Sequence, residues 1–203
     1  MPGRLFLTRE LAELAPEWLV DGLDFGGPRQ NIAPGQEVLT LTGDGARMMR
    51  WGIIPVGRKN ARGRPVMETI INARSETVFD KSAFEGVRRA VVPADGWYEW
   101  TGETRKKTGW SISPNDQSLL FFAAIYDVWI GPGGIEVPQV ATVTCEPNAD
   151  VREIHHRMGV LLTRAQVPVW LGEDDEAAKG LMRPFPDGGL VVVEATNVDW
   201  NGP

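Results

Sequence analysis

The sequence has few of the residues on which several common kinds of site depend. Cys145 is its only cysteine, so neither an internal disulfide nor a cysteine-based metal cluster can form. No apolar run approaches the ~18 residues that a membrane-spanning helix needs, and the amino-terminal residues lack the apolar stretch of a secretory signal. Basic residues are not in excess either, because the net charge is −6. We therefore expect a cytoplasmic protein without metal or cofactor, whose overall charge does not indicate nucleic-acid binding.

The length and composition predict one domain over residues 1–203. A chain of 203 residues that is 42% hydrophobic can bury a sizeable core. Cys145 closes an apolar run at 140–145. Such a cysteine is typical of an inert buried thiol, although a reactive thiol remains an alternative.

Apolar, β-branched runs between turn residues predict strands. They lie at 38–42, 90–93, 119–129, 137–144, 160–162 and 190–193. The glycine-rich turn at 130–135 lacks the Lys-Ser/Thr of a phosphate-binding loop. Helical patterns are short and do not alternate regularly with the strands, so we expect an α+β fold with a mixed or antiparallel sheet.

Four short segments carry helix signals. They are 8–14, the capping-box patterns at 82–85 and 163–166, and 173–181. The acidic residues 173–176 are explained by the helix dipole more simply than by a metal site. Residues 60–65 are basic and glycine-containing, which predicts a mobile surface loop.

Positive charge is concentrated in one part of the chain. Residues 47–107 hold thirteen Lys and Arg against seven Asp and Glu, a net +6. The same segment contains Trp51, Trp97, Tyr98 and Trp100. Aromatic rings beside cations are typical of single-stranded nucleic-acid sites. The alternative is that the tryptophans are core residues and the arginines a solvated face.

Polar groups also stand at the ends of apolar runs. Asn72 follows one such run, and Glu99 lies between aromatic residues, where lost hydration would raise its pKa and suit it to general acid or base catalysis. His155 and His156 are adjacent. In an extended segment they would point in opposite directions, so that only one would reach a given site. Each group also has a structural explanation: a turn cap for Asn72, an ion pair for Glu99 and surface exposure for the histidines.

These residues belong to a set of ordered motifs that resembles a known family. The motifs lie at 3–4, 31–34, 51–55, 72–76, 94–100 and 155–158. Their order and spacing are similar to those of the SOS response-associated peptidase (SRAP) family, whose members shield abasic sites in single-stranded DNA by a covalent link. The resemblance implies a bifurcated or barrel-like sheet with short helices around it. It also implies a role in the DNA damage (SOS) response, with the protein on the nucleoid when it is bound to DNA.

The resemblance further implies roles for particular residues. Asn72 would orient the amino-terminal nucleophile, Glu99 would transfer protons, and His155 would assist sugar opening and imine chemistry. Arg4, Arg74 and Arg157 would hold phosphates, and Trp51 and Pro34 would line the wedge where bases splay apart. The partner would be single-stranded DNA with an abasic site, bound by a monomer.

The sequence departs from the family pattern at the nucleophile. The family carries a cysteine at position 2 whose amine and thiol close a thiazolidine ring, whereas this chain has Pro2. Three interpretations remain: an iminium formed by the Pro2 amine after removal of Met1, a non-covalent binder, or a divergent copy that keeps the site by descent. Further departures are Gly57, Glu85 and Gly159.

Two other function classes stay open. One is a peptidase limited to removing its own Met1, since the sequence offers no Ser-His-Asp spacing, zinc motif or spare cysteine for general proteolysis. The other is a protein-interaction module without chemistry. Convergence of Asn72, Glu99 and His155 around the amino terminus would count against the second.

Overall fold

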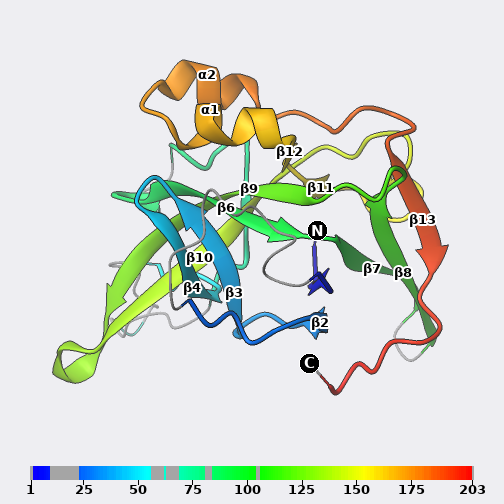
Figure 1. Cartoon of the computed structure of the whole chain (residues 1–203), viewed down its shortest axis with the longest axis horizontal. Coiled ribbons are helices and arrows are strands. Elements are labelled where there is room, and N and C mark those ends of the chain that lie inside the picture. The colour runs from blue at the N-terminus through cyan, green and yellow to red at the C-terminus, as the bar shows by residue number, and fades with distance from the viewer. Residues whose placement is uncertain are drawn as a thin grey trace.

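Two β-sheets make up most of the described chain (Figure 1). The computed structural model describes residues 2–9, 23–55, 62, 69–80, 84–103 and 106–202. The strands are β1 (Arg4–Leu7), β2 (Arg29–Ile32), β3 (Glu37–Thr42), β4 (Gly45–Trp51), β5 (Asn72–Arg74), β6 (Arg88–Ala94), β7 (Gly96–Glu103), β8 (Lys106–Pro114), β9 (Leu120–Ile130), β10 (Glu136–Cys145), β11 (Met158–Gly159), β12 (Leu161–Leu162) and β13 (Leu190–Glu194).

The larger sheet closes on itself. Strand β4 pairs with β3, β3 with β6, β6 with β9 and β9 with β10. Strand β10 then pairs in parallel with β4, which completes a ring, and also in parallel with the short β5. Because the remaining pairings in this ring are antiparallel, the prediction of an α+β fold with a mixed, barrel-like sheet is confirmed.

A sharp bend carries the chain from the barrel into the smaller sheet, whose order is β13-β8-β7-β1-β2. The bend lies between β6 and β7, where Asp95 donates its backbone N–H to Phe6 O at 2.9 Å. A Cβ atom on Gly96 would lie 2.2 Å from Ile112 O and 2.4 Å from Phe6 Cζ. Only glycine therefore allows β7 to pack this closely against β1 and β8, its neighbours in the smaller sheet.

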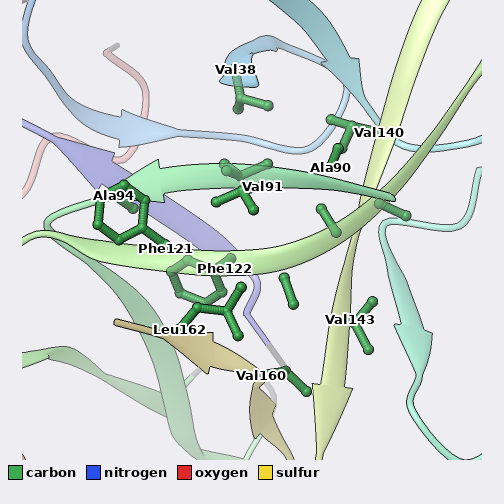
Figure 2. Packing of buried hydrophobic residues seen from close by; sticks show 14 of the residues in the cluster. Val38, Ala90, Val91, Ala94, Phe121, Phe122, Val140, Val143, Val160 and Leu162 are labelled. Atoms are coloured by element: carbon green, nitrogen blue, oxygen red, sulfur yellow. The ribbon is translucent and has the colours of Figure 1, made fainter. Parts of the chain in front are cut away.

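The hydrophobic core lies inside the barrel and between the barrel and the smaller sheet. Val91, Phe122 and Leu162 point into one apolar cluster in Figure 2, and all three are buried. Every predicted strand run contains or forms a strand of the structure, because burial of β-branched and aromatic side chains on pleated strands drives the fold. The sequence patterns did not reveal β1, β2, β4, β5, β7, β8 and β11.

Helices cover one end of the barrel (Figure 1). The predicted capping box at 163–166 is confirmed, with a short 3-10 turn that leads into α1 (Val167–Leu171). The helix predicted at 173–181 is α2 (Asp175–Gly180). Most of the helix predicted at 8–14, part of the one at 82–85 and all but Arg62 of the loop at 60–65 lie outside the described residues. Within the described chain, no helix has the length and apolar character to span a membrane.

Candidate functional site

The site begins where the amino-terminal end of the chain meets β5. Pro2 is buried just before β1, and Asn72 is the first residue of β5. The amide Nδ2 of Asn72 donates a hydrogen bond to Pro2 O at 3.0 Å. Its Oδ1 accepts from Thr142 Oγ1 at 2.5 Å. Since β5 is paired along its length with β10, the barrel holds Asn72 and Asn72 holds residue 2.

Glu99 faces the interior of the molecule from β7. Alternate residues of a strand share a face, so Glu99 points to the same side as Trp97. The Trp97 ring meets Phe122 of β9 edge-on at 5.7 Å, which identifies that side as the one facing the barrel. Burial raises the pKa of Glu99 to about 7, against the opposing effects of the positively charged amino terminus and of Trp97. The predicted rise is confirmed, and the carboxyl can donate or accept a proton near neutral pH.

His155 precedes β11 and is half-buried. Burial lowers its pKa to about 4, and the charge of the amino terminus lowers it further. The imidazole is therefore neutral at pH 7. Its Nδ1 lies 2.9 Å from the backbone N–H of Arg157, which can only donate, and 3.1 Å from Arg157 O. In the neutral ring Nδ1 then accepts and Nε2 carries the proton. The charge of the amino-terminal end acts on both Glu99 and His155, and Asn72 bonds to Pro2.

The expectation that the two histidines point in opposite directions is wrong. Their rings stack, with centroids 4.3 Å apart and planes at 24°. The reason is that the segment is not extended: residues 151–154 form a turn, and His155 N donates to Val151 O at 2.9 Å. The two histidines differ in burial, since His156 is exposed whereas His155 is half-buried.

Arg157 is buried rather than presented at the surface. Its guanidinium pairs through both terminal nitrogens with the Glu76 carboxylate, and Nη2 also donates to Thr144 O at 2.6 Å. The hydrogen bonds from Arg157 lower the pKa of Glu76 to about 2. The predicted phosphate ligand is thus engaged with protein groups, where it anchors the segment that carries His155.

The predicted wedge residues differ in exposure. Trp51 has no exposed surface and donates from Nε1 to Ile71 O at 3.0 Å. Its side chain is a core residue, so direct stacking of a base on it is not compatible with this structure. The Trp51 backbone bonds to Gly35 and Gln36, and thereby holds the turn on which Pro34 is exposed. Trp97 is also fully buried, so the core explanation holds for two of the aromatic residues in the basic segment.

The two remaining arginines lie at opposite ends of short strands. Arg74 ends β5 and is exposed. Arg4 begins β1 opposite Tyr98, on the face of the small sheet that turns away from Glu99. Its Nη1 donates to Asn31 Oδ1 at 2.6 Å and lies 3.4 Å from Trp200 O. Arg74 is therefore the more accessible of the two.

A clamp formed by residues 199–202 was not foreseen from the sequence. Trp200 packs against Tyr98 and Trp100, with ring centroids 5.0 and 5.2 Å away. Asn31 donates to the backbone oxygens of Asp199 and Gly202 at 2.9 and 2.7 Å. Asn31 opens one of the sequence motifs, which marked it as special, but nothing in the local pattern connected it with residues 168 or more positions away.

Cys145 does not belong to the reactive groups of the site. It is buried on β10, and burial raises the pKa of its thiol to about 12. The inert interpretation is therefore the one that the structure favours. Among the described residues, no three His, Cys, Asp or Glu side chains lie close enough together to hold a metal ion.

Comparison with known proteins gives the family and the fold of this chain. A family model described as SOS response associated peptidase (SRAP) matches residues 1–198. The chain belongs to the SRAP family. The abasic site processing protein YoqW of Bacillus subtilis is 31% identical over 199 residues, which cover 91% of this chain and 88% of YoqW. YoaM of the same organism, also named an abasic site processing protein, is 33% identical over 84% of this chain and 79% of its own length.

More distant SRAP relatives and solved structures extend the match. The abasic site processing protein HMCES of Gallus gallus is 31% identical over 137 residues, 56% of this chain and 41% of HMCES. A protein from Bacteroides thetaiotaomicron superposes with a TM-score of 0.79 at 23% identity, over 96% of this chain and 92% of the other. One from Bordetella bronchiseptica gives a TM-score of 0.78 at 19% identity, over 96% and 99%. These structures establish the fold.

Proposed function

We propose that this SRAP protein recognises and processes abasic sites in single-stranded DNA at the site formed by Pro2, Asn72, Glu99 and His155. The observation that carries the proposal is a buried carboxyl with a pKa near 7 beside an amino-terminal end that Asn72 holds in place. Carboxyls are perturbed in this way where proton transfer is needed. The names of the bacterial relatives support the same substrate. We further propose that the protein works as a monomer in the cytoplasm, on the nucleoid when bound to DNA.

Each group of the site has a distinct role in this proposal. Asn72 fixes residue 2 through its carbonyl, so that the nitrogen of that residue stays in one position. Glu99 supplies a proton in its neutral form and takes one up as a carboxylate. His155, neutral with its proton on Nε2, donates a hydrogen bond to the oxygen of the opening sugar.

Pro2 determines which covalent chemistry is open to the protein. Proline has no thiol, so a thiazolidine cannot form, whereas removal of Met1 would leave a secondary amine. That nitrogen bonds to the aldehyde carbon of the opened sugar, and its proton passes to the aldehyde oxygen to give a carbinolamine. Neutral Glu99 then protonates the new hydroxyl, which leaves as water, and a cationic iminium remains beside the Glu99 carboxylate. The adduct is reversible because water can reverse each step.

The DNA contacts are divided between exposed and supporting residues. Arg74 and Pro34, both exposed, contact the phosphates and the splayed bases. Trp51 supports Pro34 through the turn at 33–36. Arg157 contributes indirectly, because it anchors the segment that carries His155. Arg4 stabilises β1 through its hydrogen bond to Asn31. In this proposal, Arg74 contacts phosphates directly, whereas Arg4 and Arg157 act only through the protein groups that they hold in place.

Binding and trapping with an abasic oligonucleotide test the proposal. We expect tighter binding to an abasic single strand than to an unmodified duplex, with affinity that falls steeply as salt rises because phosphate contacts release counterions. Equal, weak binding to both would refute the function. Borohydride reduces an iminium to a stable amine, so trapping with the Met1-free protein is expected, and its absence alongside specific binding would leave a non-covalent binder.

The peptidase alternative has its own test. A site that removes Met1 would use Glu99 on the first peptide bond. Intact mass of the wild type and of Glu99→Gln, both made in cells without methionine aminopeptidase, compares the two. Equal retention of Met1 would remove self-processing as a function of this site.

A further inference from the structure

Thr142 is a fully buried polar residue that touches the site without belonging to any of the sequence motifs. It lies on β10 directly opposite Asn72 of β5. Its hydroxyl oxygen is 2.5 Å from Asn72 Oδ1 and 3.4 Å from Ile71 O. A hydroxyl has one proton to donate, and Asn72 Oδ1 can only accept. The shorter contact is therefore a hydrogen bond from Thr142 to Asn72.

This hydrogen bond and the one to Pro2 O together hold the Asn72 amide in one of its two orientations. The oxygen and nitrogen ends of an asparagine side chain have nearly the same shape, so packing alone does not distinguish them. Pro2 O is an acceptor and requires the nitrogen end. In that orientation the oxygen end faces Thr142, whose hydroxyl supplies the donor that Oδ1 needs. Donation to Oδ1 also polarises the amide and strengthens its N–H as a donor.

We propose that Thr142 is a positioning residue, which orients the Asn72 amide so that it holds the carbonyl of residue 2 and thereby fixes the amino-terminal nitrogen for reaction. The inference rests on the proposed function, since it explains how the same site is kept ready. Strand β5 has three residues, so its own backbone pairing constrains a side chain less than a long strand would. The contact from β10, which is part of the closed barrel, supplies the missing constraint.

Three variants separate this role from a general effect on packing. Thr142→Val keeps the shape and removes the hydroxyl, while Thr142→Ser restores the hydroxyl without the methyl group. Thr40→Val is the matched control, because Thr40 is also fully buried in the larger sheet and its hydroxyl donates to Val38 O at 3.3 Å, away from Asn72. Thr142→Cys, with a weaker donor of similar size, replaces Thr142→Val if that variant does not fold.

Two readouts are needed. The first is solvent exchange of the Asn72 side-chain NH2, followed by nuclear magnetic resonance without DNA. The second is the rate of borohydride trapping with an abasic single strand, measured together with the dissociation constant of that strand.

We expect Thr142→Val to expose the Asn72 NH2 to exchange and to slow trapping about tenfold, the effect of losing one buried hydrogen bond. The dissociation constant should stay within about twofold, because the DNA contacts are elsewhere. Thr142→Ser and Thr40→Val should behave as the wild type in both readouts.

The outcomes distinguish the inference from the proposed function. Unchanged NH2 exchange in Thr142→Val overturns the inference, whatever the DNA results. Equal loss of trapping in Thr40→Val also overturns it, since packing would then be the cause. If the wild type binds no abasic strand, the proposed function fails, and exchange that changes only in Thr142→Val still supports the orienting contact itself.

Discussion

Replacement of Glu99 by glutamine should stabilise the protein at alkaline pH while it removes the proton-transfer group. The buried carboxyl has a pKa of about 7 in the folded protein against an ordinary value of 4.5. Between these values the folded protein keeps a proton that the unfolded chain has released, so the free energy of unfolding falls as pH rises. One pKa unit corresponds to about 1.4 kcal/mol, which makes the full loss roughly 3 kcal/mol. Glutamine does not titrate and avoids this loss.

The measurement is the difference in unfolding free energy between Glu99→Gln and the wild type, from urea titrations followed by tryptophan fluorescence. The difference should grow from its value near pH 4.5 by about 3 kcal/mol near pH 8. A difference is required because His155, whose pKa is lowered to about 4 by burial, makes stability rise over part of the same interval. The wild-type profile alone would mix the two effects.

The Glu99→Gln experiment has a matched control at an exposed carboxyl. Glu136 is an exposed carboxyl at the start of β10, so Glu136→Gln is the control for replacing a carboxyl by an amide on the surface. If the difference for Glu99→Gln does not change between pH 4.5 and pH 8, the carboxyl does not lie in the desolvated position described here. The reasoning about proton transfer at pH 7 would then lose its basis.

Three further outcomes follow from the packing. Burial of Cys145, whose pKa is raised to about 12, should protect it from iodoacetamide near pH 8 until urea unfolds the protein, and rapid labelling of the native state by mass spectrometry would contradict this. Gly159→Ala places a Cβ 2.4 Å from Phe122 Cε1 and should cost about 1–3 kcal/mol, seen as a lower melting temperature. Trp200→Ala removes the ring contact with Trp100 and should cost roughly 2 kcal/mol in urea unfolding, less than the ~3–5 kcal/mol of a fully buried tryptophan; an unchanged midpoint would mean that the clamp is not stabilising.

Local sequence determined the long strands and the character of Glu99. Strands β9 and β10 come from runs of apolar, β-branched and aromatic residues that are stable only when buried on a pleated sheet. The raised pKa of Glu99 could be predicted because its aromatic neighbours along β7 accompany the carboxyl into the interior. Both results depend on interactions between residues that are close in sequence.

Pairing of distant segments decided the rest of the site. Strand β5 has three residues and no pattern of its own, and it exists because β10 offers a parallel partner. Burial of Trp51 depends on the closure of the barrel, to which it belongs, and the position of Arg157 depends on Glu76. No local rule separates these residues from exposed members of the same types.

The sequence motifs illustrate the difference between what the local sequence and what the tertiary structure determine. The sequence alone determined which residues the chain carries at the site, including a proline in place of a cysteine at position 2. Only the tertiary structure decided that Asn72 bonds to Pro2 and that Thr142 orients it, over separations of 70 residues in each case. Hydrogen bonds of about 3 Å require backbone positions that the closed barrel fixes and that no short segment can fix alone.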